Sequence, residues 1–484
     1  MAEVELKFQI PLHTRSQFEQ DFQQYAPARH HLYAQYFDTH DQQLQQHKIA
    51  LRQRLEDKQW FQTLKAPARH EFERFELEHC LGETQPESCN FHLYQKDKQA
   101  KKILKQAIGK LNTPLLLQFE TEVKRQVIQY NYQQSQIEIA FDIGEIRSGD
   151  QIAHIYEVEF ELKTGTLDQL IACVETWVEP YQLWLDVRNK SERGYALLKA
   201  EQQLPVQHQV VLNLEEETDV AKILQKIVAN CLTHLFPNAT AIALEHYNSD
   251  HVHQARVAVR RLRSALKIFQ SETKKCPAEW QDQLRDIFQQ LGATRDRDAL
   301  AGSLLPQLKQ AGSPLLVLPP APKGQFNISQ LFQQPAITKL FLELLGFSQR
   351  KFKPHPSSHK TLCTSLSSLH HKICEDAANY IQLDIEARHR TRKRVKRLRY
   401  NIEFLQSLFV EQEVKAYLKA LKPVQESLGH YNDLFVAEEL FLPYVKKQPK
   451  AWFVLGWIKA EQQRLSAEAA ARLIQFTKTE PFWS

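Results

Sequence analysis

Seven segments in the first 165 residues alternate apolar and polar side chains, and this alternation limits the folds open to the N-terminal part of the chain. Alternation with a period of two is typical of β-strands whose two faces meet different surroundings. The segments are residues 4–10, 49–55, 60–65, 72–78, 118–129, 136–143 and 155–162. Helical patterns interrupt them at residues 15–25, 96–111 and 167–180. The pattern predicts an antiparallel sheet of about eight strands, curled or closed, with flanking helices.

From about Asp219 onward the pattern changes to the longer period of α-helices. Segments rich in Ala, Leu, Gln, Lys, Arg and Glu follow one another to the end of the chain. Residues 201–217 show no clear period, and residues 310–324 form an interruption that contains Pro and Gly. We therefore predict a strand-rich domain over residues 1–201, a linker over residues 202–216 and an all-helical domain over residues 217–484.

The helical part contains an internal repeat. The motif His-x-x-Arg-x-x-x-(Arg/Lys)-Arg-Leu-Arg occurs twice, beginning at His253 and at His389. A Leu-Gly pair follows each copy at nearly the same distance, with its glycine at Gly292 and Gly429. Two copies of one helical unit predict an all-α bundle with an internal two-fold repeat.

Composition and termini exclude several classes of protein. The formal net charge of the 484 residues is only +5, so the overall charge does not identify a partner. The seven cysteines include no Cys-x-x-Cys pair, which disfavours a disulfide framework and a thiolate zinc site. No secretory signal begins the chain, and no apolar run reaches the roughly 18 residues of a membrane span. We expect a cytoplasmic protein without a membrane partner.

Charged side chains recur at every second position of the predicted strands, so they project from one face of each strand. The acidic residues on these faces are Glu3, Glu5, Glu76, Glu78, Glu138, Asp142, Glu157, Glu159 and Glu161. The basic residues are Lys7, Arg52, Arg54, Lys65, Arg125 and Lys190, and most of them lie on other strands than the acids.

A sheet with one solvated face explains any single strand of this kind. Acids two positions apart on one strand repel each other, however, and so indicate a compensating ligand. If this face turns inward, its carboxylates fit Mg²⁺ or Mn²⁺, and its Lys and Arg side chains fit phosphate oxygens. The chain has no Gly-rich phosphate loop of the Walker type. The ligand that fits best is a short phosphate chain bound with a divalent metal ion.

The order of these residues resembles the CYTH, or triphosphate tunnel metalloenzyme, superfamily over about residues 1–200. Glu3-Val-Glu5-Leu-Lys7 resembles the ExExK signature of that family. The later motifs follow in the order of the family, at Arg52 and Arg54, Lys65, Glu76 and Glu78, Arg125, Asp142, Glu157 and Glu159, and Lys190. The resemblance implies an α+β domain, a closed eight-stranded antiparallel β-barrel or tunnel with flanking helices, that hydrolyses triphosphate compounds. Joined to a helical partner, it is similar to the inorganic triphosphatases of bacteria.

Metal-ion chemistry assigns roles to the matched residues. The expected ligands of phosphate oxygens are Lys7, Arg52, Arg54, Lys65, Arg125 and Lys190. The expected ligands of Mg²⁺ or Mn²⁺ are Glu3, Glu5, Glu76, Glu78, Asp142, Glu157 and Glu159. The expected catalytic residues are Glu3, Glu5, Lys7 and Lys190, and the products are pyrophosphate and phosphate. Three alternatives stay open: hydrolysis of an organic triphosphate such as thiamine triphosphate, an adenylate cyclase, and a non-catalytic scaffold that binds polyphosphate.

The repeated helical motif places basic residues along one face of each helix, because successive residues are about 100° apart. These stripes consist of His253, Arg256, Arg260 and Arg263 in the first copy and His389, Arg392, Lys396 and Arg399 in the second. One basic face is usually only solvated, but stacked cations repel each other, and two copies of the same arrangement indicate an anionic ligand. The absence of a helix-turn-helix, zinc-finger or RNP-type motif disfavours nucleic acid as that ligand.

The two copies resemble the CHAD domain, a helical family built from two such units, over about residues 217–484. The resemblance implies a bundle with a basic central channel that binds inorganic polyphosphate. The dense charge of such a polymer matches two facing Arg and His stripes. We expect His253 and His389 to be partly protonated, so that binding strengthens at lower pH.

Overall fold

The structure is a computed structural model. It describes residues 2–67, 73–86, 88–109, 113–201, 203–214, 217, 219–269, 276–320, 327–350 and 359–483, without the side chains of residues 2, 3, 73, 293–299 and 359. The chain forms two compact units. The first is Met1–Val206 with Ala239–Tyr247 and Ser329–Gln349, and the second is Gln207–Asn238, Asn248–Ile328 and Arg350–Ser484. Each unit thus combines segments that are separated in the sequence.

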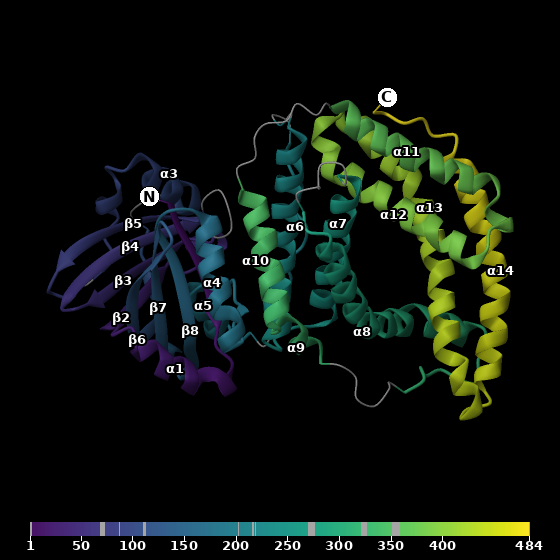
Figure 1. The fold of residues 1–484 in the computed structure, drawn as a ribbon. Coiled ribbons are helices and arrows are strands. Elements are labelled where there is room, and N and C mark those ends of the chain that lie inside the picture. The colour runs from purple at the N-terminus through teal and green to yellow at the C-terminus, as the bar shows by residue number, and fades with distance from the viewer. Residues whose placement is uncertain are drawn as a thin grey trace. The chain divides into compact units, whose positions relative to one another are not determined.

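The first unit is built on one antiparallel sheet (Figure 1). Its strands are β1 (Ala2–Gln9), β2 (Ala28–Asp38), β3 (Ala50–Glu56), β4 (Gln59–Pro67), β5 (Glu73–Gly82), β6 (Leu116–Tyr132), β7 (Ser135–Ser148), β8 (Gln151–Thr164) and β9 (Trp184–Leu185). They lie in the order β5-β4-β3-β2-β6-β7-β8-β1-β9. Strand β1 also pairs with β5, through three residue pairs from Ala2↔Phe75 to Val4↔Glu73.

The antiparallel sheet with flanking helices is confirmed, but the predicted number of strands is wrong. The short strand β9 pairs with β1 and makes the sheet nine-stranded. The alternation of charged residues also did not predict β2. The reason is that β2 turns mainly uncharged side chains to the charged face, among them the apolar Ala28, Leu32 and Ala34.

The apolar face of the sheet is covered by helices, as expected for a strand with two unlike faces. The helices of this unit are α1 (Arg15–Gln23), α2 (Gln43–Gln46), α3 (Lys98–Ile108), α4 (Leu167–Tyr181), α5 (Lys190–Leu198) and α10 (Pro335–Gln349). Phe18 of α1 lies 5.0 Å from the ring of Phe141 on β7, and Trp177 of α4 lies 5.9 Å from that of Phe160 on β8. These aromatic contacts fix α1 and α4 on the sheet and leave the charged face free of them.

Helix α5 begins at Lys190 because Asn189 forms a capping box with Glu192. Its Gly194 faces Phe119 of β6, and a Cβ atom at that position would lie 2.2 Å from the ring. Only glycine therefore permits so close an approach of α5 to the sheet. The approach brings Lys190, at the first turn of the helix, against the acidic residues of β7 and β8.

The remaining described residues form helices and no strand, which confirms an all-helical C-terminal region. The helices are α6 (Val220–Ala243), α7 (Ser249–Ile268), α8 (Glu279–Gln310), α9 (Ile328–Phe332), α11 (His359–Ala378), α12 (Ile385–Leu405), α13 (Glu411–Phe441) and α14 (Ala451–Phe476). Of these, the last five residues of α6 and all but the first residue of α9 belong to the first unit. The two sequence copies occupy matching elements, α7 with α8 and α12 with α13 (Figure 1). None of the described helices is long and apolar enough to cross a membrane.

Candidate functional site

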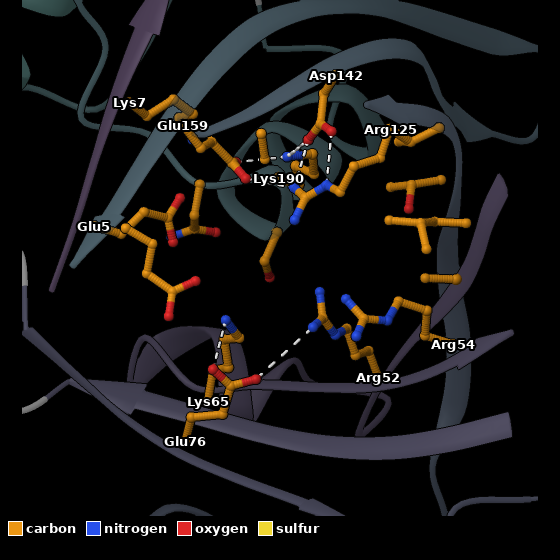
Figure 2. A pocket seen from close by; sticks show the side chains of 18 of the residues that line it. Glu5, Lys7, Arg52, Arg54, Lys65, Glu76, Arg125, Asp142, Glu159 and Lys190 are labelled. Carbon is orange, nitrogen blue, oxygen red and sulfur yellow. Dashed lines mark hydrogen bonds and ion pairs between the residues drawn. The ribbon is translucent and has the colours of Figure 1, made fainter. Parts of the chain in front are cut away.

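The charged face of the sheet surrounds a cavity of about 530 Å³ in the first unit (Figure 2). The predicted site residues that line it are Glu5, Lys7, Arg52, Arg54, Lys65, Glu76, Glu78, Arg125, Asp142, Glu159 and Lys190. Glu157 is fully buried and contacts Lys190 next to the cavity. Glu3 belongs to β1, but its side chain lies outside the described residues. The structure thus brings the described members of the predicted set together.

On one wall of the cavity, Lys190 and Arg125 bind three carboxylates. The Nζ atom of Lys190 lies 2.7 Å from Asp142, 2.8 Å from Glu157 and 2.7 Å from Glu159. Arg125 donates two hydrogen bonds to Asp142, at 2.8 and 2.6 Å, and also contacts Glu159. Carboxylate oxygens of the three acids lie within 4.8 Å of one another, a spacing that suits a cation, and in this structure the ammonium group of Lys190 contacts all three.

The cations on this wall keep its acids ionised. Burial alone would raise the pKa of Asp142, but Arg125 and Lys190 outweigh it and lower that pKa. Burial would likewise raise the pKa of Glu159, yet Lys190, Arg125 and Lys7 hold it well below its usual range. Conversely, burial lowers the pKa of Lys190 and Arg125, and the acids raise both pKa values well above their usual range. The wall is a network of fixed charges at neutral pH.

Strands β3, β4 and β5 supply the opposite wall. The Nζ atom of Lys65 lies 2.9 Å from Glu76, Arg52 lies 3.9 Å from the same carboxylate, and Arg54 lies 3.6 Å from Glu78. In Figure 2 the charged ends of Lys65, Arg52 and Arg54 point toward the centre of the cavity. Burial and the neighbouring Arg52 lower the pKa of Arg54, so its positive charge is only partly compensated. Such a wall favours an anion in the cavity.

Strand β1 places Glu5 and Lys7 beside the acidic wall. Lys7 is 8% exposed and lies opposite Glu159 in the β1–β8 register. The pKa of Glu5 is raised by burial and by repulsion from Glu159, and Lys65 and Lys7 only partly offset this. Glu5 is therefore a half-buried carboxylate whose charge a further cation would stabilise.

Basic and acidic residues lie mostly on different strands, as predicted, but they do not form separate rings. Cross-strand neighbours pair instead, because antiparallel register sets Lys65 opposite Glu76 and Arg125 opposite Asp142. Each wall therefore carries both signs of charge.

The sequence analysis missed charged residues at the buried end of the cavity. Asp186 is 1% exposed and accepts hydrogen bonds from Arg188, at 3.0 and 2.8 Å, and from Gln9, at 3.0 Å. Arg193 of α5 donates to Glu157 at 2.7 Å. The alternation of Asp186, Arg188 and Lys190 was visible in the sequence, but no strand pattern accompanied it.

At the more exposed end, Lys163 lies 2.7 Å from Glu161 and 3.4 Å from Glu138. All three line the cavity, and the side chains of the two acids are about one-quarter exposed. Continuing the alternation of β8 by one step beyond Glu161 would have identified Lys163. These residues add a further set of paired charges to the lining of the cavity.

In the second unit, both predicted stripes are half-buried, which a merely solvated basic face would not be. The residues concerned are His253, Arg256, Arg260 and Arg263 on α7 and His389, Arg392, Lys396 and Arg399 on α12. The guanidinium group of Arg260 lies 5.6 Å from the ring of Tyr400 on α12, and that of Arg261 lies 4.8 Å from the ring of Phe404. Cation–π contacts between the two copies therefore hold the stripes together.

The glycine of the Leu-Gly pair in the first copy has a packing role. A Cβ atom at Gly292 of α8 would lie 3.1 Å from a terminal nitrogen of Arg256. The guanidinium group of Arg256 also stacks on the ring of Phe288, which likewise lies on α8, at 4.5 Å from the ring centroid. Glycine therefore leaves room for this guanidinium beside α8. At Gly429, in the second copy, no described atom lies within 4 Å of such a Cβ.

Crowding of positive charge is greatest at Lys396. Its pKa is lowered to about 5 by burial and by repulsion from Arg260 and Arg392, which Asp433 only partly offsets. Burial and Arg392 also lower the pKa of His389. Basic residues of both copies thus lower the pKa of Lys396. We call the eight residues of the two stripes together the basic stripes.

An antiparallel sheet around a cavity of paired acids and bases, followed by a duplicated basic helical unit, defines a protein of two parts, each with a concentration of basic side chains. Models of known families match both parts: the CYTH domain over residues 1–195 and the CHAD domain over residues 226–442. The protein therefore carries a CYTH domain at its N-terminus and a CHAD domain at its C-terminus.

A curated relative is the inorganic triphosphatase of Haemophilus influenzae, 29% identical over 205 residues. The match covers 41% of this chain and 55% of the relative, so the chain spans about half of that protein. The crystal structure of the CHAD domain from the plant Ricinus communis is 29% identical and covers 57% of this chain and 97% of that one, with a TM-score of 0.48. A candidate adenylyl cyclase from Hippeastrum with a dominant triphosphatase activity is 16% identical over 42% of this chain and 98% of that one, with a TM-score of 0.30.

Proposed function

We propose that the N-terminal unit hydrolyses inorganic triphosphate to pyrophosphate and phosphate with the help of a divalent metal ion. The observation that carries the proposal is the cavity of about 530 Å³ in which cationic side chains on facing walls point inward beside carboxylates. A triphosphate combines high negative charge with small size and needs cations on several sides. The name of the Haemophilus influenzae relative supports the same activity.

The proposal includes a closed tunnel. Strands β1 to β8 would form it through the pairing of β1 with β5, and β9 would lie outside the ring. Closure turns the charged face away from bulk water, and electrostatic contacts between the protein and a phosphate chain gain strength when water is excluded.

In this proposal the basic residues of both walls bind the phosphate chain, and those of one wall also stabilise the leaving group. Arg52, Arg54 and Lys65 bind oxygens of the phosphate chain, with the planar guanidinium groups able to bind two oxygens at once. Lys7, Arg125 and Lys190 bind the chain from the other wall and stabilise the charge that develops on the leaving pyrophosphate.

Attack by water breaks one phosphoanhydride P–O bond. Glu3 and Glu5 would orient this water, and a carboxylate of the lining that does not bind the metal ion would take up its proton. The released phosphate and the pyrophosphate then leave through the exposed end of the cavity.

The donor set fits Mg²⁺ or Mn²⁺. The proposed ligands offer carboxylate oxygens, which these ions prefer: Glu3, Glu5, Glu76, Glu78, Asp142, Glu157 and Glu159. The half-buried carboxylate of Glu5 lines the cavity beside Glu159, and its raised pKa, which reflects incomplete compensation of its charge, favours a bound cation. When bound, such an ion neutralises phosphate charge and lowers the pKa of water.

The lining of the cavity favours inorganic triphosphate over a nucleotide or thiamine triphosphate. A purine or thiazole ring needs flat apolar walls, and the ring side chains among the described lining residues are Tyr36 and His30. We expect kcat/KM for triphosphate to exceed that for ATP and for thiamine triphosphate by about tenfold or more. Phosphate release from each substrate, with Mg²⁺ and with Mn²⁺, measures this. A preference for either organic substrate would favour the alternative enzyme.

We further propose that the C-terminal unit binds inorganic polyphosphate along the basic stripes. The supporting observation is that stripes from two separate copies come together around Lys396. A polyphosphate chain presents closely spaced negative charges that would relieve this repulsion. Binding should therefore weaken steeply with rising salt concentration.

Lys396 makes this proposal testable through pH. Because its pKa is about 5 in the free protein, the side chain is neutral at pH 7, and a bound polyanion raises this pKa. The complex then holds more protons than the free protein, so affinity is expected to fall as the pH rises above 5. Calorimetry in buffers of different ionisation enthalpy should show proton uptake on binding. The uptake should be smaller by up to about one proton in Lys396→Met, and equal uptake in both proteins would contradict the assignment.

A further inference from the structure

Residues 442–453, which comprise the turn between α13 and α14 and the first three residues of α14, expose large apolar side chains. The two helices pack side by side as a hairpin (Figure 1), and we call this segment the hairpin tip. Leu442, Trp452 and Phe453 of the tip are 56%, 63% and 40% exposed. Tyr444 and Val445 pack against the core between the helices. The tip is therefore anchored in the core, while its largest apolar side chains face outward.

The charge of the tip is entirely positive. Lys446, Lys447 and Lys450 are exposed, and no Asp or Glu occurs between Glu439 and Glu461. Exposed aromatic rings thus lie within a few residues of three lysines that have no acidic neighbour in the sequence.

The loop after α8 also exposes apolar side chains. Leu315 and Leu318 belong to the core cluster that anchors the tip. Between them, Leu316 and Val317 are 43% and 58% exposed. Residues 311–320 contain no charged side chain. Two segments that share one core cluster therefore both turn apolar side chains outward.

We propose that the hairpin tip and this loop dock the protein onto an anionic lipid surface. Trp, Phe and Leu side chains are stabilised when they enter the boundary between lipid headgroups and acyl chains. Lysines are attracted electrostatically to anionic headgroups. Polyphosphate would match the lysines but offers Trp452 and Phe453 no apolar surface. A second copy of the chain would set the same lysines against one another. Docking of this kind needs no spanning segment, so it revises the expectation of no membrane partner.

Co-sedimentation of the full chain with vesicles tests the proposal. Vesicles of phosphatidylcholine alone are compared with vesicles that also contain phosphatidylglycerol. We expect binding to the anionic vesicles, weakened by salt. The double substitution Trp452→Ser/Phe453→Ser should lower the vesicle affinity about tenfold or more, and Lys446→Gln/Lys447→Gln/Lys450→Gln should remove the preference for anionic lipid. Ile474→Ser, at another exposed apolar position on α14, is the matched control and should bind normally.

Absence of binding by the unaltered protein, equal binding to both kinds of vesicle, or full binding by the folded tip variants would overturn the proposal. Self-association that the tip variants abolish, without vesicle binding, would assign the surface to a second copy instead. The variant Arg256→Glu/Arg392→Glu distinguishes vesicle binding by the tip from vesicle binding by the basic stripes. It should retain vesicle binding, whether or not the stripes bind polyphosphate. Loss of vesicle binding in that variant, with the tip variants unaffected, would also overturn the proposal.

Discussion

Replacement of Glu5 by glutamine is expected to lower metal-dependent phosphate release from triphosphate by about 100-fold or more. Glutamine keeps the size of the side chain but removes the charge that this half-buried position holds beside Glu159. The variant should lose affinity for the metal ion as well as turnover, since both depend on that charge. Initial rates over a range of Mg²⁺ and Mn²⁺ concentrations measure the two effects separately.

A suitable control is Glu122→Gln. Glu122 also lies on a strand of the sheet, β6, but it contacts Arg147 and His31 and does not line the cavity. Its substitution should leave the rate within a factor of about two. Full metal-dependent activity in Glu5→Gln, or in Glu3→Ala, would exclude the proposed roles of the N-terminal carboxylates.

The double charge reversal Arg256→Glu/Arg392→Glu should weaken polyphosphate binding by about 100-fold or more, because each change replaces an attraction by a repulsion. Hydrolysis of triphosphate should persist, since both residues belong to the second unit and the cavity to the first. Filter binding of labelled polyphosphate and phosphate release from triphosphate, on the same preparation, measure the two effects.

The matched control makes the same change in net charge at two residues outside the basic stripes. Arg390→Glu/Lys393→Glu alters two exposed residues of α12 and should reduce polyphosphate binding far less. If reversal disturbs the packing of Arg256 against Phe288, then Arg256→Gln/Arg392→Gln gives a milder test. Equal losses in the reversal and control variants, or a collapse of hydrolysis in the reversal variant, would contradict separate sites.

Most of the candidate active site could be predicted because the side-chain period of a strand is fixed at two. Glu5, Lys7, Arg52 and Arg54 face the cavity for that reason alone. The pairing of Lys190 with Asp142 could not be predicted, since it depends on the approach of α5 at Gly194. Nor could the sequence show that a segment after residue 320, helix α10, belongs to the first unit, where Gly346 packs against Ile171 of α4.

For the basic stripes, too, the sequence pattern predicted which residues share a helix face but not how the helices pack. Helical geometry placed Arg256 and Arg260 on one face of α7, and Arg392 and Lys396 on one face of α12. Their joint effect on the pKa of Lys396 depends on how the two copies pack, which no local pattern encodes. The prediction that His389 is partly protonated also needs correction: burial and Arg392 lower its pKa, so a bound anion would have to restore the proton.

The most direct test of the central claim is phosphate release from inorganic triphosphate after removal and return of the metal ion. Purified protein treated with EDTA should release no phosphate above background, and added Mg²⁺ or Mn²⁺ should restore the rate. This result is expected if the carboxylates around the cavity bind a divalent ion that hydrolysis requires. Release that EDTA does not affect, or no release from triphosphate with either metal ion, would contradict a metal-dependent triphosphatase.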